Sequence, residues 1–202
     1  MEKGETKNVY EVYNKIATWF SENRDEVLME KKYLDDLIAQ LPAEGTVLDV
    51  GCGTGKPILA YLVNQNVQVT GVDASSKILD IAKENFPTTT FILQDMRYLD
   101  INRQFDAIIA WHSFFHLPVA DQPLMFTLFE KHLNPNGILL FTSGTENGEA
   151  WGMCGGENLF HASLDTDEYH SLLEKHHFKA LKHVINDPDC GYATVWMAKY
   201  LP

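Results

Sequence analysis

Three glycines at alternating positions, Gly51, Gly53 and Gly55, directly follow a short segment rich in β-branched residues. Glycine has no Cβ, so a loop built from it can turn sharply and bring its backbone into contact with a ligand that a side chain would keep away. The spacing therefore predicts a strand over residues 47–50 that ends in a ligand-binding loop.

Two carboxylates accompany this loop. Asp49 stands just before the glycines, and Asp73 follows a second predicted strand over residues 67–72. An acidic side chain about 20 residues beyond such a loop commonly binds a ribose hydroxyl. The loop and Asp73 together indicate an adenosine-type ligand. Asp49 indicates that this ligand carries positive charge, because a carboxylate is out of place beneath a pyrophosphate.

The glycine spacing separates two kinds of adenosine ligand. The fingerprint G-x-G-x-x-G/A of nicotinamide dinucleotides requires a small residue at its last position, where this chain has Lys56 or Ile58. Asp49 followed by the three alternating glycines instead resembles the first motif of class I S-adenosylmethionine-dependent methyltransferases. The resemblance implies that Asp49 lies near the methionine end of the cofactor and that the loop, including Cys52, binds it.

Two further motifs of that family have counterparts at the ends of the next strands. The segment that ends in Asp73 and Ala74 resembles the second motif, which implies that these residues bind the ribose. The segment that ends in Asp95 and Met96 resembles the third. This implies that Asp95 accepts a hydrogen bond from the adenine amino group and that Met96 packs on the ring.

The resemblance continues toward the C-terminus. Residues 105–111 resemble the fourth motif, which implies that Trp111 lines the reacting end of the site, and residues 134–140 resemble the following turn and strand. Five matches in the family's order extend the resemblance over residues 10–199. They are far more specific than any single match.

The family resemblance implies an α/β fold: a doubly wound, Rossmann-like, mostly parallel seven-stranded sheet with an antiparallel C-terminal edge hairpin and helices on both faces. The alternation of strand and helix patterns also predicts a doubly wound parallel sheet. Strands are expected near residues 47–50, 67–72, 90–93, 107–110, 138–142, 182–185 and 193–198.

Helix starts are also marked in the sequence. Pro57 stands where the first helix after the glycine loop would begin, a position at which its missing N–H costs nothing. Ser75 and Ser76 are candidate caps for the next helix. Asp121 is the candidate cap for the helix that ends near His132.

We expect one globular domain, with an N-terminal helical lid over residues 1–40 and an S-adenosylmethionine-binding methyltransferase domain over residues 41–202. In similar methyltransferases a helix that contains tyrosine covers the cofactor, so Tyr13 and Trp19 are candidates for closing the site. The alternative is that these aromatic side chains only pack the helix onto the sheet.

An insertion over residues 144–165 lies outside the nucleotide-binding framework. It combines five glycines with Trp151, Met153 and Phe160, and it predicts a loop without regular structure that covers an organic substrate. A flexible surface connection is the alternative.

His116 is the candidate catalytic residue. It follows the fourth predicted strand, where an imidazole could remove a proton from the methyl acceptor. A structural role for a hydrogen-bonded His116 is the alternative. His112 lies four positions earlier, the spacing of two zinc ligands on a helix, but Ser113 replaces the glutamate of a metalloprotease and no third ligand is evident. We therefore expect no metal.

Composition agrees with an ordinary globular enzyme: of 202 residues, 45% are hydrophobic and 22% are charged. The net charge of −12 and the lack of a basic cluster argue against a nucleic-acid substrate. The N-terminus lacks the apolar segment of a signal peptide, and no apolar run could span a membrane, so we expect a cytoplasmic protein without a membrane partner. Three widely spaced cysteines are expected to be free thiols.

The sequence therefore predicts an enzyme that transfers a methyl group from S-adenosylmethionine to a small molecule by direct displacement, leaving S-adenosylhomocysteine. Such a reaction depends chiefly on alignment of donor and acceptor in a dry site. One alternative is a non-catalytic protein that binds S-adenosylmethionine. A nicotinamide-dependent oxidoreductase is the other, and the glycine spacing disfavours it.

Overall fold

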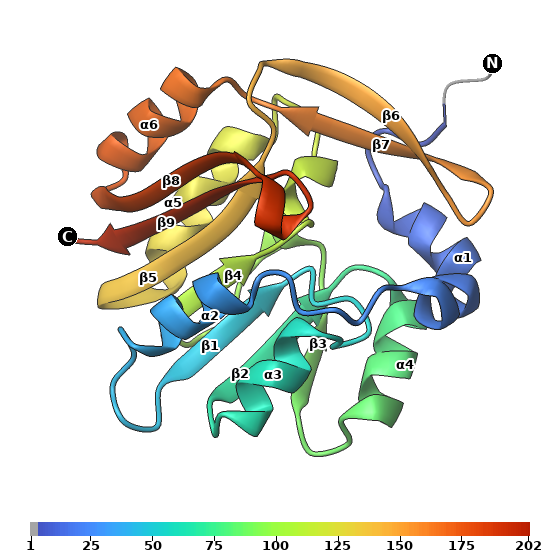
Figure 1. The fold of residues 1–202 in the computed structure, drawn as a ribbon, viewed down its shortest axis with the longest axis horizontal. Helices are drawn as coiled ribbons and strands as arrows, with labels where there is room; N and C mark the ends of the chain where they lie inside the picture. The colour runs from blue at the N-terminus through green and yellow to red at the C-terminus, as the bar shows by residue number, and fades with distance from the viewer. Residues whose placement is uncertain (1–3) are drawn as a thin grey trace.

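A seven-stranded sheet forms the centre of the molecule in the computed structural model, which describes residues 4–202 (Figure 1). The strand order is β3-β2-β1-β4-β5-β9-β8. The first five strands in this order are parallel to one another, and β9 is antiparallel to both β5 and β8. The fold class predicted from the sequence is confirmed. The bounds are β1 Thr46–Val50, β2 Gln68–Asp73, β3 Thr90–Leu93, β4 Phe105–Ala110, β5 Leu133–Ser143, β8 Phe178–Asp187 and β9 Ala193–Tyr200.

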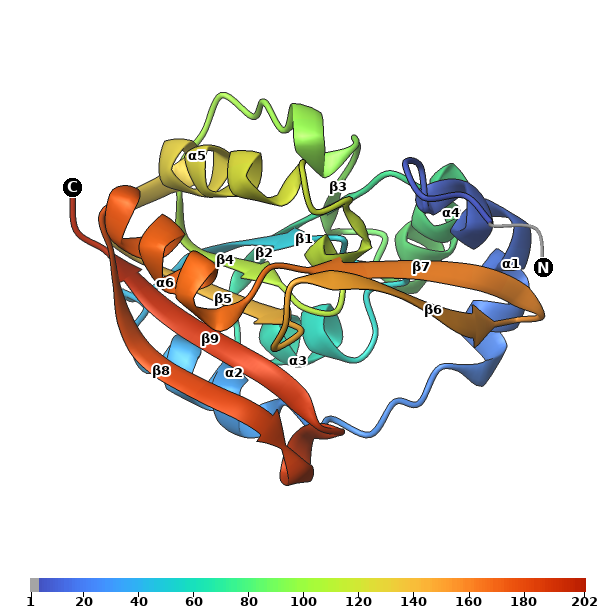
Figure 2. The same ribbon diagram turned by 90° about the horizontal axis from the view of Figure 1, so that it is seen from above.

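Helices cover both faces of this sheet (Figure 2). Helices α5 and α6 pack on one face, whereas α2 and α3 pack on the other. Helix α4 lies beside β2 and β3, and α1 packs against α4. The bounds are α1 Tyr10–Asn23, α2 Lys31–Ile38, α3 Ile58–Asn64, α4 Ser76–Asn85, α5 Gln122–His132 and α6 Thr166–Lys175, with short 3-10 turns η1 Met96–Tyr98, η2 Phe114–His116 and η3 Pro188–Cys190.

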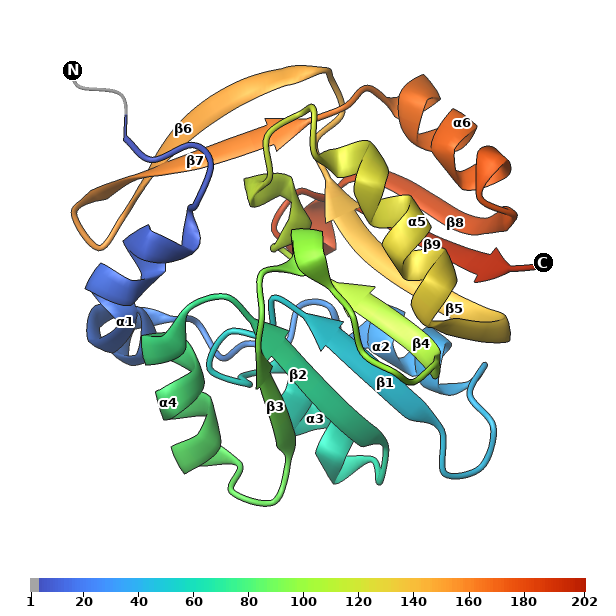
Figure 3. The same ribbon diagram turned by 180° about the vertical axis from the view of Figure 1, so that it is seen from behind.

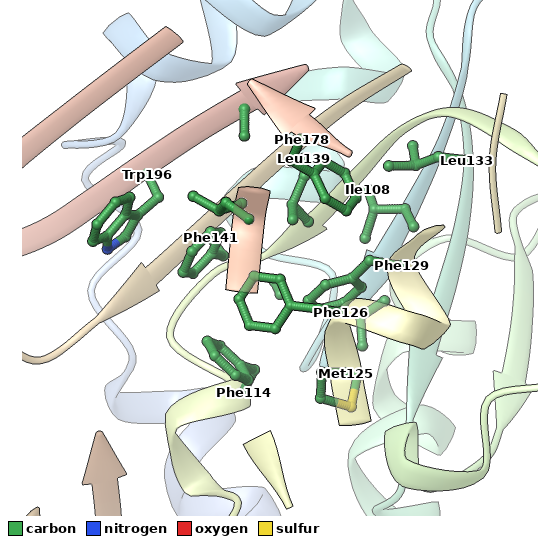
Figure 4. Packing of buried hydrophobic residues seen from close by; sticks show 14 of the residues in the cluster. Ile108, Phe114, Met125, Phe126, Phe129, Leu133, Leu139, Phe141, Phe178 and Trp196 are labelled. Carbon is green, nitrogen blue, oxygen red and sulfur yellow. The ribbon is translucent and has the colours of Figure 1, made fainter. Parts of the chain in front are cut away.

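Aromatic side chains dominate the core between the sheet and α5 (Figure 4). Phe114 is fully buried there, and its ring meets the rings of Phe126 and Phe141 edge-to-face, with centroids 6.3 and 5.6 Å away. Phe141 in turn stacks on Trp196 at 5.7 Å. Because interiors pack densely, this cluster fixes Phe114 and with it the turn η2 that follows β4.

The N-terminal stretch is helical, as predicted, but it forms two helices with different partners. Helix α2 packs under the sheet through Leu34 and Leu37, which are fully buried. Helix α1 instead lies away from the sheet, against α4 and the insertion after β5. Residues 1–3 of the predicted lid lie outside the described residues.

The insertion is not an irregular loop. It forms a two-stranded antiparallel hairpin, β6 Gly148–Cys154 and β7 Glu157–Ser163, that extends from the end of β5 toward α1 (Figures 1 and 3). Its turn is made by Gly155 and Gly156, both with positive φ. The prediction of a segment without regular structure was therefore wrong, because these glycines mark one tight turn between two strands.

The sequence marks the starts of α3, α4 and α5. The structure agrees with the roles predicted for the marking residues of α3 and α4, but not with side-chain capping by Asp121 at α5. Pro57 immediately precedes α3, and the Ser75 hydroxyl accepts a hydrogen bond from the backbone N–H of Ile78 at the start of α4. Asp121 occupies the N-cap position of α5 but makes no capping hydrogen bond. Its carboxylate accepts a hydrogen bond from Arg97 instead, because the guanidinium lies within reach.

Candidate functional site

A cavity of about 290 Å³ opens where the parallel strands end. Its walls come from the turns after β1, β2, β3 and β4, from α1 and the residues that flank it, and from one side chain of β7. Ligands of doubly wound sheets bind outside the carboxyl ends of the strands, so this is the expected place for a site.

Most of the site residues predicted from the sequence line this cavity. Two do not: Gly55 packs behind the loop, where an added Cβ would lie 2.6 Å from the Phe86 ring, and Trp19 is 44% exposed on α1. Phe20, the neighbour of Trp19, faces the cavity in its place. The residues brought together are Tyr13, Asp49, Gly51, Cys52, Gly53, Asp73, Ala74, Asp95, Met96, Trp111 and His116.

Gly51 and Gly53 serve the loop in different ways. Gly51 has φ +77°, and a Cβ there would lie 2.3 Å from Cβ of Ser113, whose hydroxyl donates to the Val50 carbonyl at 2.6 Å. Gly51 therefore lets the loop after β1 touch the turn after β4. Gly53 has φ +57° and meets only the Phe20 ring at 3.8 Å. The space beside it is left for a ligand.

Two carboxylates line the cavity at the ends of β1 and β2: Asp49, which is buried, and Asp73, which is half-buried. Asp73 accepts hydrogen bonds from the N–H groups of Gly53 at 3.0 Å and Ser75 at 2.8 Å. Asp49 is 3% exposed and has no hydrogen-bond partner within residues 4–202. Burial, with a smaller contribution from Asp73, raises the pKa of Asp49 to about 7. A buried carboxylate that forms no hydrogen bond is costly to ionise, so Asp49 can receive a cationic group of a ligand.

Arg24 is a cavity residue that the sequence analysis missed. It follows α1, its Nε donates to the Lys56 carbonyl at 2.9 Å, and its guanidinium lies over the Phe20 ring. Its charge offsets part of the rise in the pKa of Asp49. No carboxylate of the described chain forms an ion pair with Arg24, so this cation can receive an anionic group of a ligand.

Asp95 is held in place by a buried arginine. Arg97 donates to both carboxylate oxygens of Asp95, with Nη2 2.5 Å from Oδ2, and also to Asn8 at 2.9 Å and to Asp121 at 3.3 Å. This network raises the pKa of Arg97. Through its three partners, the Arg97 side chain links the N-terminal segment, η1 and the start of α5. Asp95 keeps its place in the cavity wall beside Met96.

The opposite end of the cavity is aromatic. The Tyr13 hydroxyl oxygen lies 3.0 Å from Nε2 of His116, and the Phe160 carbonyl oxygen lies 2.8 Å from Nδ1 of the same ring. A carbonyl only accepts, so Nδ1 of His116 carries the proton and Nε2 accepts from the Tyr13 hydroxyl. Burial lowers the pKa of His116 to about 3. The interaction joins α1 to the site, and it leaves His116 without a free nitrogen for catalysis.

Three histidines meet at this end without forming a metal centre. His112 has φ +48° and stacks on Trp111, and the rings of His116 and His161 lie 4.8 Å apart. Within residues 4–202, no group of three His, Cys, Asp or Glu side chains is arranged to hold a metal ion. His161 comes from β7, and the sequence analysis did not find it because the hairpin itself was not recognised.

No helix in the described part of the chain combines the length and the apolar character required to cross a bilayer.

Comparison with known proteins gives a family and a fold. Residues 47–137 match the methyltransferase-domain family. Cyclopropane-fatty-acyl-phospholipid synthase of Escherichia coli (strain K12) is 36% identical over 110 residues, which cover 53% of this chain and 28% of that protein. This chain spans less than half the length of the first curated relatives it matches.

Two solved structures resemble the whole chain. One is an S-adenosylmethionine-dependent methyltransferase from Clostridium acetobutylicum, with a TM-score of 0.73, 17% identity, and coverage of 95% of this chain and 100% of that one. The other is CalS10, an amino pentose methyltransferase from Micromonospora echinaspora solved with bound SAM, with a TM-score of 0.71, 18% identity, and coverage of 98% and 99%. At this identity the likeness establishes a shared fold.

Proposed function

We propose that this chain, whose residues 47–137 belong to the methyltransferase-domain family, transfers the methyl group of S-adenosylmethionine to a small-molecule acceptor. The observation that carries the proposal is Asp49, a buried carboxylate that faces the cavity without a hydrogen-bond partner in the described chain. The family match of residues 47–137 and the fold of the chain support the same cofactor, S-adenosylmethionine.

The charged side chains fit the amino-acid end of S-adenosylmethionine. Asp49 would bind the ammonium group, because an ionised partner relieves the cost of its burial. Arg24 would bind the carboxylate, since it faces the same cavity and forms no ion pair within residues 4–202. The open space beside Gly53 would let the backbone approach the ligand.

The remaining cavity residues fit the nucleoside. Asp73 has two oxygens that already accept from Gly53 and Ser75, and a carboxylate has lone pairs left for a ribose diol. Asp95 would accept from the adenine amino group while the ion pair with Arg97 keeps it oriented. Met96 would pack on the base. These assignments retain the roles that the sequence predicts.

When bound, the sulfonium supplies an activated methyl group with a good leaving group. The protein then needs to align the acceptor with that methyl group and to exclude water. Trp111 and Tyr13 form apolar walls at that end of the cavity. Tyr13 also fastens α1 across the site through His116, so closure of the lid and formation of the reaction site coincide.

A small acceptor is favoured by the size of the cavity and by the charge of the chain. At about 290 Å³, the cavity lies just below the range of roughly 300–1,000 Å³ for small-molecule sites. The net charge of −12 opposes a polyanionic nucleic acid. CalS10, with the same fold, acts on an amino pentose.

Ligand binding by the purified protein tests the proposal. Thermal unfolding is measured with S-adenosylmethionine, S-adenosylhomocysteine and NAD, each in excess. A ligand at ~100 times its Kd stabilises the folded state by about 2.7 kcal/mol, which raises the Tm by several degrees. The two methionine-derived ligands should raise the Tm, and Asp73→Ala should abolish most of that rise. A rise with NAD alone would overturn the proposal.

A further inference from the structure

The two halves of the cavity differ in charge. All of its charged side chains come from the loops after β1, β2 and β3 and from the residues that flank α1. The wall formed by the turn after β4 and by β7 contains aromatic, imidazole and aliphatic groups without a formal charge, and the Ser113 hydroxyl, which donates to the Val50 carbonyl. The aromatic, imidazole and aliphatic residues of this wall are Trp111, His112, Phe115, His116, Leu117 and His161, which we call the aromatic pocket.

Within the aromatic pocket, His116 is already engaged on both ring nitrogens. It accepts from Tyr13 and donates to the Phe160 carbonyl. His161 differs, because no side chain within residues 4–202 forms a hydrogen bond with it. Its ring lies 4.8 Å from the ring of His116 and 5.2 Å from that of Phe115, centroid to centroid. It is half-buried and faces the cavity, so a ligand can reach it.

The protonation of this pocket follows from its burial. Burial lowers the pKa of His161, and the nearby Leu159 carbonyl offsets part of that effect. The titratable groups that face His161 are His112 and His116, and burial lowers their pKa values to about 4 and about 3. Tyr13 stays protonated because burial raises its pKa. The pocket is therefore uncharged near neutral pH.

We infer that the aromatic pocket is the acceptor site, that it takes an uncharged, single-ring aromatic or heteroaromatic molecule bearing an O–H, N–H or S–H group, and that His161 accepts the proton of that group. The inference rests on the proposed function. The flat walls favour a ring, and none of the pocket's own side chains is a cation for a carboxylate or phosphate, or a carboxylate for an ammonium group. Arg24, whose charge acts on His112, belongs to the other half of the cavity, where the proposed function gives it the carboxylate of the cofactor.

The methyl transfer balances with His161 as the base. As a lone pair of the acceptor atom forms the bond to the methyl carbon, the carbon–sulfur bond breaks and its electron pair stays on sulfur, giving a neutral thioether. The acceptor proton moves to the free ring nitrogen of His161. One positive charge thus passes from the sulfonium to the imidazolium, which releases the proton to solvent when the site opens.

Ring-matched ligands test the class of acceptor. Phenol and aniline, both uncharged at neutral pH, are compared with para-hydroxybenzoate and tyramine, which add a carboxylate and an ammonium group to the phenol ring. Binding is measured by calorimetry on the protein saturated with S-adenosylhomocysteine. The uncharged rings should bind at least about tenfold more tightly, the result of ~1.4 kcal/mol of discrimination. Equal or tighter binding of either charged analogue would overturn the inference.

Variants of His161 test its role. His161→Gln should keep its affinity for S-adenosylhomocysteine and lose about 10²–10⁴-fold in turnover of a phenol. The loss should be much smaller for an acceptor that is already ionised, such as para-nitrophenol in mildly alkaline buffer. Free imidazole should restore part of the activity of His161→Ala. His170→Gln is the matched control, because His170 is an exposed histidine on α6, outside the cavity.

The outcomes separate this inference from the proposed function. If S-adenosylhomocysteine does not bind, the proposed function itself fails. If it binds and His161→Gln turns over phenol at the wild-type rate, or imidazole gives His161→Ala no recovery, the role of His161 is refuted while the cofactor assignment stands.

Discussion

At the level of single residues, Gly51 has no room for a methyl group. Gly51→Ala would place Cβ 2.3 Å from Cβ of Ser113 and would hold a non-glycine residue at φ +77°. The left-handed conformation costs ~1–2 kcal/mol and overpacking a further ~1–3 kcal/mol. We expect the free energy of unfolding in urea to fall by about 2–4 kcal/mol.

Gly148→Ala is the control for that substitution. Gly148 has no neighbour within 4 Å of an added Cβ and lacks a positive φ. Its free energy of unfolding should stay within about 0.5 kcal/mol of the wild type. Equal effects at the two positions would show that the contact between Gly51 and Ser113 does not limit stability.

The ionised Asp49 carboxylate should lower the stability of the ligand-free fold and strengthen the binding of S-adenosylmethionine. Its pKa is raised to about 7, so the ligand-free fold loses stability as pH rises from about 4 to about 7 and the carboxylate is forced to ionise. Asp49→Asn avoids that charge. At about pH 8 the ligand-free variant should be more stable by on the order of 2–4 kcal/mol, since ~1.4 kcal/mol accompanies each unit of pKa shift.

The same variant should bind S-adenosylmethionine at least about tenfold more weakly, because a charge-assisted hydrogen bond to the ammonium group contributes roughly 1.5–3 kcal/mol. Urea unfolding and calorimetry measure the two effects. Asp80→Asn, which changes an exposed carboxylate on α4, should alter neither. A variant that is less stable and still binds would refute the assignment of Asp49.

At the level of elements, α1 and the β6–β7 hairpin form one unit. Val12 and Ile16 of α1 are buried against Phe160 and Ala162 of β7. Ile16→Ala removes part of this contact at a cost of roughly 2–4 kcal/mol. Hydrogen exchange should therefore speed up in α1 and β7 together while the central sheet stays protected.

Leu34→Ala is the comparison for Ile16→Ala. Leu34 is equally buried, but it lies on α2 under the sheet, so its loss should lower the stability of the whole domain. Unchanged exchange of β7 in Ile16→Ala would mean that the hairpin is held independently of α1. In that case the lid could open without disturbing the aromatic pocket.

The elements differ in how well the sequence predicts them. The central strands β1 and β4 carry apolar runs that are largely buried, and both were found within two residues of their bounds, whereas β5 begins at Leu133, five residues before its predicted start. The hairpin was missed because Gly148 and Gly152 interrupt the alternation that marks a strand. Asp121 is the N-cap residue of α5, as predicted, but its side chain does not cap the helix, and Arg97, distant in sequence, binds that carboxylate.

For the whole molecule, the match of residues 47–137 to the methyltransferase-domain family could be predicted because the motifs are local. Each consists of a few consecutive residues at a strand end, and parallel strands bring those ends to one edge of the sheet. Arg24 and His161 could not be predicted in this way. They reach the cavity from a helix end and from a hairpin, so their place depends on tertiary packing.

Ligand binding should also change how the stability of the whole molecule depends on pH. In the ligand-free fold Asp49 keeps its proton up to about pH 7, whereas the unfolded chain releases it near pH 4. The ammonium group of S-adenosylmethionine would bind the ionised carboxylate. At a fixed ligand concentration, the stability gained on binding should therefore grow with pH by up to ~1.4 kcal/mol per pH unit until about pH 7, and then level off.

Thermal unfolding with and without ligand between about pH 5 and pH 8 measures this gain. Burial lowers the pKa values of His112 and His116, so the fold also loses stability in acid as their unfolded forms take up protons. That loss affects free and bound protein alike and cancels in the difference. In Asp49→Asn, the stability gained on ligand binding should not vary with pH. If the stability that the wild type gains on ligand binding stays constant or shrinks as pH rises, Asp49 does not bind the ligand.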